Sequence, residues 1–135
     1  MNKRKPAQPL STNSSHLAGE YFVAAELYRR GYEVGITIGN AKAIDIFAVK
    51  GRRKVLLQVK AIRDKKSIGW PISWDRIEDG IVYVFVLVNP PDQKPSYFIL
   101  SAEEARENVK QYETRGILNL HSVKSSRFRN RWDKI

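Results

Sequence analysis

The segment Ile81–Val88, with the sequence IVYVFVLV, constrains the fold of this chain more than any other feature. All of its residues except one leucine are β-branched or aromatic, and no polar side chain interrupts the run. A strand of this kind is covered on both faces, as in the middle of a layered sheet. We therefore predict a buried central strand here. The run is also much too short to span a bilayer, so we expect no membrane partner.

Two helices and four more strands are expected around this strand. Apolar residues at helical spacing predict a first helix that starts at Ser14 or Ser15 and ends at Gly31. Its expected inward stripe contains Leu17, Tyr21, Ala24, Leu27 and Tyr28, with Glu20 on or beside the same side. Residues 32–38, 44–50, 54–61 and 97–100 read as strands. Ser101 is expected to cap a second helix, with Glu104 placed to complete a capping box.

The resulting order is α-β-β-β-β-β-α, which predicts an α/β fold with a central mixed sheet and flanking helices. A chain of 135 residues that is 42% hydrophobic fits one such domain. We assign residues 14–135 to this domain, with a basic tail at its end. The polar and basic residues 1–13 are read as a flexible arm. Their lack of an apolar signal stretch favours a cytoplasmic protein.

The charge of the chain indicates a polyanionic partner such as DNA. Lysine and arginine total 24 against 14 acidic residues, which gives a formal net charge of +10. Basic residues and aromatic residues alternate in several segments. The residues expected to contact nucleic acid are Lys3, Arg4, Lys5, Arg52, Arg53, Arg63, Lys65, Lys66, Trp70, Arg127, Arg129 and Arg131. Trp70 and Trp74 could stack on bases or cover a core edge, and Phe128 and Trp132 could instead anchor the tail on the domain while its arginines stay solvated.

The chain contains no cysteine, so a bound metal would need oxygen or imidazole ligands. Mg²⁺ or Mn²⁺ is then the expected ion. The two histidines, His16 and His121, do not lie at a zinc-binding spacing. His16 lies one helical turn before Glu20 and could contact substrate, but a lone histidine near a helix start is more often a solvated polar residue, which is the expectation here.

Three polar residues interrupt the otherwise apolar strands of residues 44–50 and 54–61. In a hairpin that turns at residues 50–53, counting back along both strands places Asp45 opposite Gln58, with Lys60 on the same face as Gln58. This convergence requires a loop of even length, because a slip of one residue would send Asp45 to the other face. The alternative is that Asp45 and Lys60 form only an ion pair at the strand ends.

The order of Glu20 in the first helix, Asp45 in IDIFAV and Gln58-Val59-Lys60 in LLQVKA resembles the PD-(D/E)xK nuclease superfamily. That superfamily includes restriction-endonuclease-like proteins and archaeal Holliday junction resolvases. In this chain Ile44 replaces the proline that often precedes the aspartate, and Gln58 replaces the usual acid. Such a glutamine resembles the variant of methyl-directed restriction enzymes and some homing endonucleases.

The resemblance implies a restriction-endonuclease-like fold and Mg²⁺- or Mn²⁺-dependent hydrolysis of phosphodiester bonds in duplex or branched DNA. The metal ligands would be Asp45, Gln58 and the Val59 carbonyl, with Glu20 acting directly or through water. Lys60 would position the attacking water and offset charge in the transition state. Cleavage of both strands would favour a homodimer. Two rivals remain open, namely a catalytically inactive nucleic-acid-binding module of the same fold and a basic structural protein.

Overall fold

The structure is a computed structural model that describes residues 11–37, 43–63 and 67–135. Within these ranges, the elements of the first half are α1 (Thr12–Arg29), β1 (Glu33–Ile36), β2 (Ile46–Lys50), β3 (Arg53–Arg63), β4 (Gly69–Pro71) and η1 (Trp74–Arg76). Those of the second half are β5 (Ile81–Val88), β6 (Ser96–Leu100), α2 (Ala102–Asn108), β7 (Lys110–Gln111), β8 (Gly116–Asn119), α3 (Leu120–Val123) and η2 (Trp132–Lys134).

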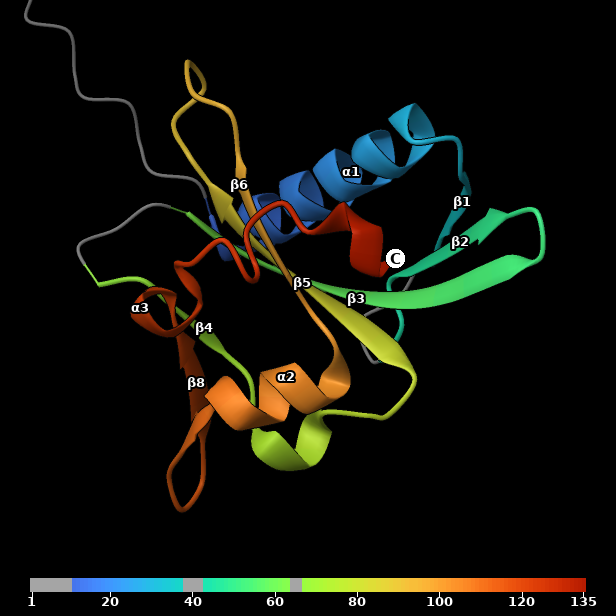
Figure 1. The fold of residues 1–135 in the computed structure, drawn as a ribbon. Helices are drawn as coiled ribbons and strands as arrows, with labels where there is room; N and C mark the ends of the chain where they lie inside the picture. The colour runs from blue at the N-terminus through green and yellow to red at the C-terminus, as the bar shows by residue number, and fades with distance from the viewer. Residues whose placement is uncertain (1–10, 38–42, 64–66) are drawn as a thin grey trace, which may run out of the picture.

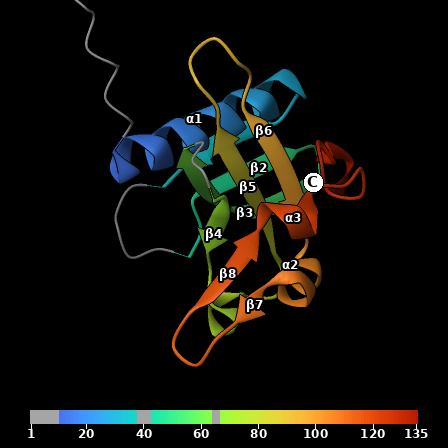
Figure 2. The ribbon, with the colours of Figure 1, turned by 90° about the vertical axis from the view of Figure 1, so that its left-hand side faces the viewer.

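A mixed five-stranded sheet with the strand order β1-β2-β3-β5-β6 forms the centre of the molecule. The pair β3–β5 is parallel, and the other neighbouring pairs are antiparallel. The helix α1 lies along one face of this sheet, whereas α2 and a small sheet of order β4-β8-β7 lie on the other side (Figures 1 and 2). The predicted α/β fold with a central mixed sheet is confirmed.

The central strand β5 has the predicted bounds and is covered on both faces. Val84 and Val86 belong to the core beneath α1, where they join Val23 and Leu27 of the helix. Phe85 points to the opposite side and belongs to a second core on the face of β4 and β8. The apolar character of both faces of the strand thus follows from the two layers that enclose it.

The helix α1 begins two residues before its predicted start because Ser11 provides the cap. The Ser11 hydroxyl accepts a hydrogen bond of 3.0 Å from the backbone N–H of Ser14. The helix ends before Gly31, whose φ of +89° is readily adopted by glycine. Ser11, Thr12 and Asn13, which were assigned to the flexible arm, therefore belong to the cap and first turn of the helix. Residues 1–10 lie outside the described residues, so the rest of the arm and the contacts of Lys3, Arg4 and Lys5 stay predictions.

The inward stripe of α1 differs in part from the predicted one. Ala24, Leu27 and Glu20 are buried as expected, but Tyr21 is 64% exposed and Tyr28 is 58% exposed. Leu17 is exposed as well. The reason is a close approach through small residues: a Cβ atom added to Gly19 would lie only 2.3 Å from the Cβ atom of Ala61 in β3. Because Gly19 faces the sheet, the helical period places Leu17, Tyr21 and Tyr28 on the opposite side of the helix.

The last third of the chain contains more regular structure than its composition suggested. The strand β8 pairs with both β4 and β7, so the loop around Trp70 and the segment after α2 form one small sheet. Phe128 and Trp132 are buried, which confirms that they anchor the tail on the domain. The capping box of Ser101 and Glu104 at the start of α2 is also confirmed.

Candidate active site

The hairpin of β2 and β3 has the predicted register and an even loop. Lys50 pairs with Arg53, and the pairing continues to Ile46 and Leu57. Only Gly51 and Arg52 form the turn, and the φ of +60° at Gly51 suits a tight connection. The side chains of Gln58 and Lys60 therefore share one face of β3, as the sequence indicated.

Asp45 does not lie directly opposite Gln58, which corrects the sequence-based expectation. The backbone N–H of Asp45 donates to the carbonyl of Leu57, a shift of one residue from the register of the hairpin. The Asp45 carboxylate Oδ2 accepts a hydrogen bond of 2.8 Å from the backbone N–H of Val59. The amide Nε2 of Gln58 instead donates to the carbonyl of Ala43 at 3.0 Å. The ladder thus opens one residue before β2 begins, and the two side chains do not form the expected opposed pair.

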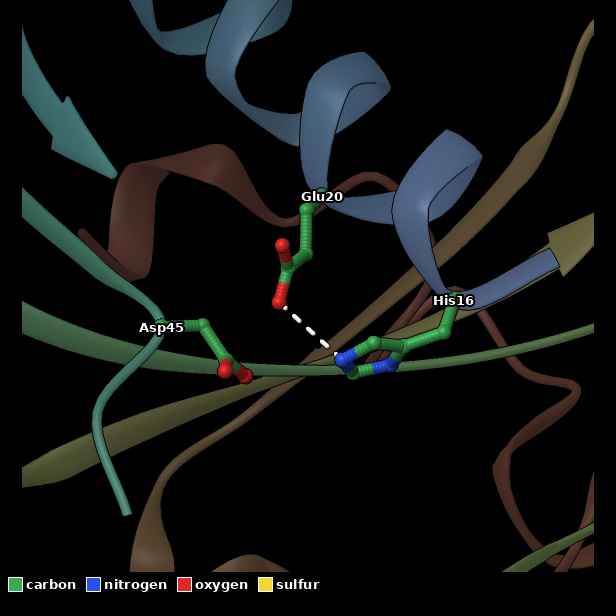
Figure 3. Close-up of side chains that lie close together, drawn as sticks. All are labelled: His16, Glu20 and Asp45. Carbon is green, nitrogen blue, oxygen red and sulfur yellow. Dashed lines mark ion pairs between the residues drawn. The ribbon is translucent and has the colours of Figure 1, made fainter. Parts of the chain in front are cut away.

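The carboxylate of Asp45 meets two side chains of α1. Figure 3 shows Glu20 and His16 extending from successive turns of the helix toward Asp45. One ligand atom from each of the three residues lies within 4.8 Å of the others. His16 Nε2 lies 3.1 Å from Glu20 Oε1. Glu20 and Asp45 are each only 3% exposed, so two acidic groups are buried at the same point.

Lys60 of β3 borders two clefts, one beside this cluster and one beside Gln58. Burial lowers the pKa of its ammonium, an effect that the negative charge of Asp45 opposes and the positive charge of Arg76 reinforces. Lys60 lines a cleft of 670 Å³ together with Ser15 and His16. It also lines a second cleft, of 620 Å³, together with Gln58. The site therefore extends over both faces of the sheet at the part of β3 beyond its pairing with β2, and the carboxylates lie on the α1 side.

The structure brings only some of the predicted nucleic-acid contacts near this site. Arg63 lines the first cleft beside His16. Arg52 and Arg53 are exposed at the hairpin turn, about 23 Å along the strand from Lys60. Lys65 and Lys66 lie outside the described residues.

The three arginines of the tail make contacts within the protein. Arg131 donates two hydrogen bonds of 2.8 Å to Asp133, and this guanidinium lowers the pKa of Asp133 to about 2. Arg127 lies 3.7 Å from a carboxylate oxygen of Glu104. The guanidinium of Arg129 lies over the ring of Phe98. These contacts attach Arg127 to α2, Arg129 to β6 and Arg131 to η2, rather than to the cleft residues.

Trp70 is a core residue, which corrects the expectation that it stacks on bases. Its side chain is fully buried, and the indole N–H donates to the carbonyl of Val86 at 3.0 Å. The ring also packs against Phe85 and Phe98. Trp74 is the exposed tryptophan of the same segment, with 51% of its surface accessible.

Three residues of the site region were not among the site residues predicted from the sequence. His16 was assigned to solvent, although its spacing of four residues before Glu20 places both on one helix face. Arg76 and Arg115 line the second cleft and come from segments that are distant in sequence. Only the tertiary fold places these two arginines beside Lys60, and no local pattern identifies them.

No protein-family model matches the chain, and no curated protein matches it in sequence. Solved structures do resemble it. Hjc of Archaeoglobus fulgidus, a Holliday junction resolvase, has a TM-score of 0.55 at 17% identity, covering 82% of this chain and 88% of its own. The bacterial homing endonuclease I-Ssp6803I has the same TM-score at 14% identity, covering 69% of this chain and 67% of its own.

These similarities, together with the element order, define the restriction-endonuclease-like fold that the PD-(D/E)xK resemblance implied. The chain thus shares its architecture with nucleases. Among the described residues, no helix is both long and apolar enough to cross a membrane.

Proposed function

We propose that the protein is a metal-dependent DNA endonuclease that hydrolyses phosphodiester bonds. The observation that carries this proposal is the meeting of the buried carboxylates of Glu20 and Asp45 beside Lys60. Acidic ligands next to an ammonium group combine the two requirements of the reaction, which are a cation site and a group that can act on a water or a phosphate.

The donor set fits a hard divalent ion such as Mg²⁺ or Mn²⁺. Two buried carboxylates at close range repel each other, and a cation between them relieves both this repulsion and the cost of their burial. Val59 supplies a further oxygen: in a strand, the N–H and C=O of one residue point to the same edge, and the Val59 N–H points to Asp45. A bound divalent ion would supply Lewis-acid stabilisation of the phosphate.

Gln58 would contribute its amide oxygen, as the resemblance implies. The bond from Nε2 to Ala43 turns the nitrogen of the amide toward that carbonyl, so Oε1 is the end directed elsewhere. A neutral amide adds no negative charge, and this feature favours the rival function of a catalytically inactive module that only binds nucleic acid. We keep that module as the second candidate.

Lys60 would act on the reacting phosphate or on the attacking water. Its ammonium can donate hydrogen bonds to a phosphate oxygen in either cleft. The lowered pKa of Lys60 also makes its proton easier to release than that of an exposed lysine. As a charged ammonium, Lys60 would position the attacking water and stabilise the negative charge of the transition state.

DNA as the substrate is supported by the net charge of +10 and by the basic residues of the clefts. Arg63 borders the first cleft, and Arg76 and Arg115 border the second. The resolvase and the homing endonuclease named above support cleavage that is either directed to branched structures or restriction-like. Cleavage of both strands of a duplex or junction would require two active centres and hence favour a homodimer, which light scattering with DNA would test.

Cleavage of plasmid and branched DNA with Mg²⁺ or Mn²⁺ tests the proposal. The wild-type protein should nick or cut, whereas Asp45→Ala and Lys60→Ala should bind DNA but not cut it. Binding without cleavage by the wild-type protein would favour the inactive module. An absence of binding to any polyanion would favour a basic structural protein. An exposed-site variant, Lys124→Ala, serves as the control that removes one charge away from the clefts.

A further inference from the structure

His16 completes a set of three potential ligands that face one point. Its Nε2 atom lies 3.1 Å from Glu20 Oε1, and a carboxylate oxygen of Asp45 lies within 4.8 Å of both residues' ligand atoms (Figure 3). Two ligands on opposite sides of an ion at about 2.1 Å are themselves separated by about 4.2 Å. The three atoms are therefore already spaced much as the ligands of one small dication would be.

The contact between His16 and Glu20 is more than a solvent-exposed pair on a helix surface. Glu20 is 3% exposed, and Asp45, which has a carboxylate oxygen within 4.8 Å of it, is buried to the same extent. The Nε2 atom of His16, which contacts the buried carboxylate of Glu20, is a good ligand for a divalent transition metal.

A second polar group lies on the same side of the cluster. Ser15, the residue before His16, is 3% exposed, and its Oγ atom has no hydrogen-bond partner among the described residues. Ser15 and His16 line the same cleft of 670 Å³. A buried hydroxyl without a partner commonly marks the place of a water or a bound group, and this one faces a cleft wide enough for either.

We propose that His16 is a metal ligand, so that the site has mixed nitrogen and oxygen donors and prefers a divalent transition ion, such as Mn²⁺, over Mg²⁺. The inference rests on the metal site of the proposed function and adds a ligand and an ion preference to it. Mg²⁺ favours oxygen donors and retains its water shell, whereas imidazole ligands favour the transition ions. Glu20 and Asp45 would hold either ion, and His16 would discriminate between them.

Electron paramagnetic resonance of Mn²⁺ tests this directly, with an untagged protein and without DNA. The chain has only two histidines, His16 and His121, so an imidazole ¹⁴N coupling on bound Mn²⁺ has two sources at most. Electron spin-echo modulation should show this coupling in the wild-type protein and in His121→Ala. The coupling should be lost in His16→Ala and in His16→Gln.

Competition between ions gives the second measurement. Titration of Mn²⁺ in excess Mg²⁺ should show that His16→Ala lowers the preference for Mn²⁺ by about tenfold or more, with little effect on Mg²⁺ binding. His16→Ala removes a side chain that is 42% exposed, so the variant should fold, and circular dichroism would check this.

The outcomes separate the inference from the function on which it rests. Mn²⁺ binding that depends on Asp45 but shows no imidazole coupling would overturn the role of His16 and leave the oxygen-ligand site intact. A failure of Mn²⁺ and Mg²⁺ to bind at all would overturn both. Coupling that persists in His16→Ala and vanishes in His121→Ala would place the ion elsewhere and would also overturn the inference.

Discussion

The backbone N–H of Val59 donates a hydrogen bond of 2.8 Å to the carboxylate of Asp45. This bond ties an acidic side chain at the start of one strand to the main chain of the next. It replaces the ladder hydrogen bond that regular pairing would have formed at this point. The acid is thereby held by backbone geometry, and its position does not depend on a flexible partner.

Replacement of Asp45 should separate the chemical role of its charge from its structural role. Asp45→Asn keeps an oxygen that can accept from Val59, so its stability without metal should stay close to that of the wild type. Asp45→Ala leaves a buried N–H without its acceptor and should cost about 1 to 3 kcal/mol. Both variants should cut DNA at least about 100-fold more slowly. Denaturant unfolding in EDTA and plasmid cleavage measure the two effects, and cleavage by Asp45→Asn at the wild-type rate would contradict the proposed metal site.

Gln58→Glu should increase the stabilisation that a metal provides. The new charge adds to those of Glu20 and Asp45, and the hydrogen bond from Nε2 to Ala43 is lost. The metal-free variant should therefore melt at a lower temperature, whereas its rise in Tm with Mn²⁺ should exceed that of the wild type. Gln93→Glu adds the same charge in an exposed turn and serves as the control. An equal Mn²⁺ response in all three proteins would argue against a site at Gln58.

Gly19→Ala should destabilise the protein, although alanine normally favours a helix by about 0.5 to 1 kcal/mol over glycine. The added methyl group would lie 2.3 Å from the Cβ atom of Ala61, so α1 must move away from β3. We expect a loss of about 1 to 3 kcal/mol in the free energy of unfolding. Adding Ala61→Gly should restore much of it. Equal stability of Gly19→Ala and the wild type would show that the helix is not held this closely.

The two tryptophans around β4 should respond in opposite ways to truncation. Trp70→Ala removes a fully buried ring and should cost about 3 to 5 kcal/mol. Trp74→Ala removes an exposed ring and should change stability by less than about 0.5 kcal/mol. Chemical denaturation measures both. If Trp74 contacts nucleic acid, its loss should weaken binding of single-stranded DNA while the fold stays intact, a result that fluorescence anisotropy would detect.

Glu104 should make the stability of the domain dependent on pH. Burial is the largest single influence and raises the pKa of Glu104, but hydrogen bonds from Ser101 and the ammonium of Lys134 together outweigh it and lower the pKa. A carboxyl with a lowered pKa stabilises the fold above the unfolded value, near 4.3, and loses this effect as pH falls through the folded value. Glu104→Gln keeps the capping geometry and removes the charge.

We expect Glu104→Gln to be about 0.5 to 1 kcal/mol less stable than the wild type at pH 7. Urea unfolding should show this difference shrinking as the pH falls below about 4. Glu103→Gln, at an exposed position of the same helix turn, should show no such gap. A gap for Glu104→Gln that widens toward low pH would have the wrong sign and would refute this interpretation.

The sequence predicts the elements whose pattern is local. Ile81–Val88 is apolar on both faces, and the turn at Gly51 sets the register of β2 and β3, so both were predictable. The shift of one residue in the pairing of Asp45 was not predictable, because it depends on the backbone path before β2 and not on a local residue pattern.

Long-range packing accounts for the other differences. Trp70 looked like a loop residue because β4 acquires its partner, β8, only from a segment nearly fifty residues later. Gly19 was equally uninformative, since its role depends on Ala61 in another element. His16 had a usable signal in its spacing from Glu20, but its importance rests on Asp45 being nearby.

The strand order β1-β2-β3-β5-β6 places some residues of the site in the middle of the sheet and others near its edge. Lys60 and Gln58 belong to β3, which is paired on both sides, whereas Asp45 precedes β2, whose outer neighbour is the edge strand β1. The outer strands β1 and β2 can separate from the sheet while the parallel pair β3–β5 stays intact. Warming the protein should therefore displace Asp45 from the proposed metal site before the domain melts, so that loss of metal binding would precede loss of the fold.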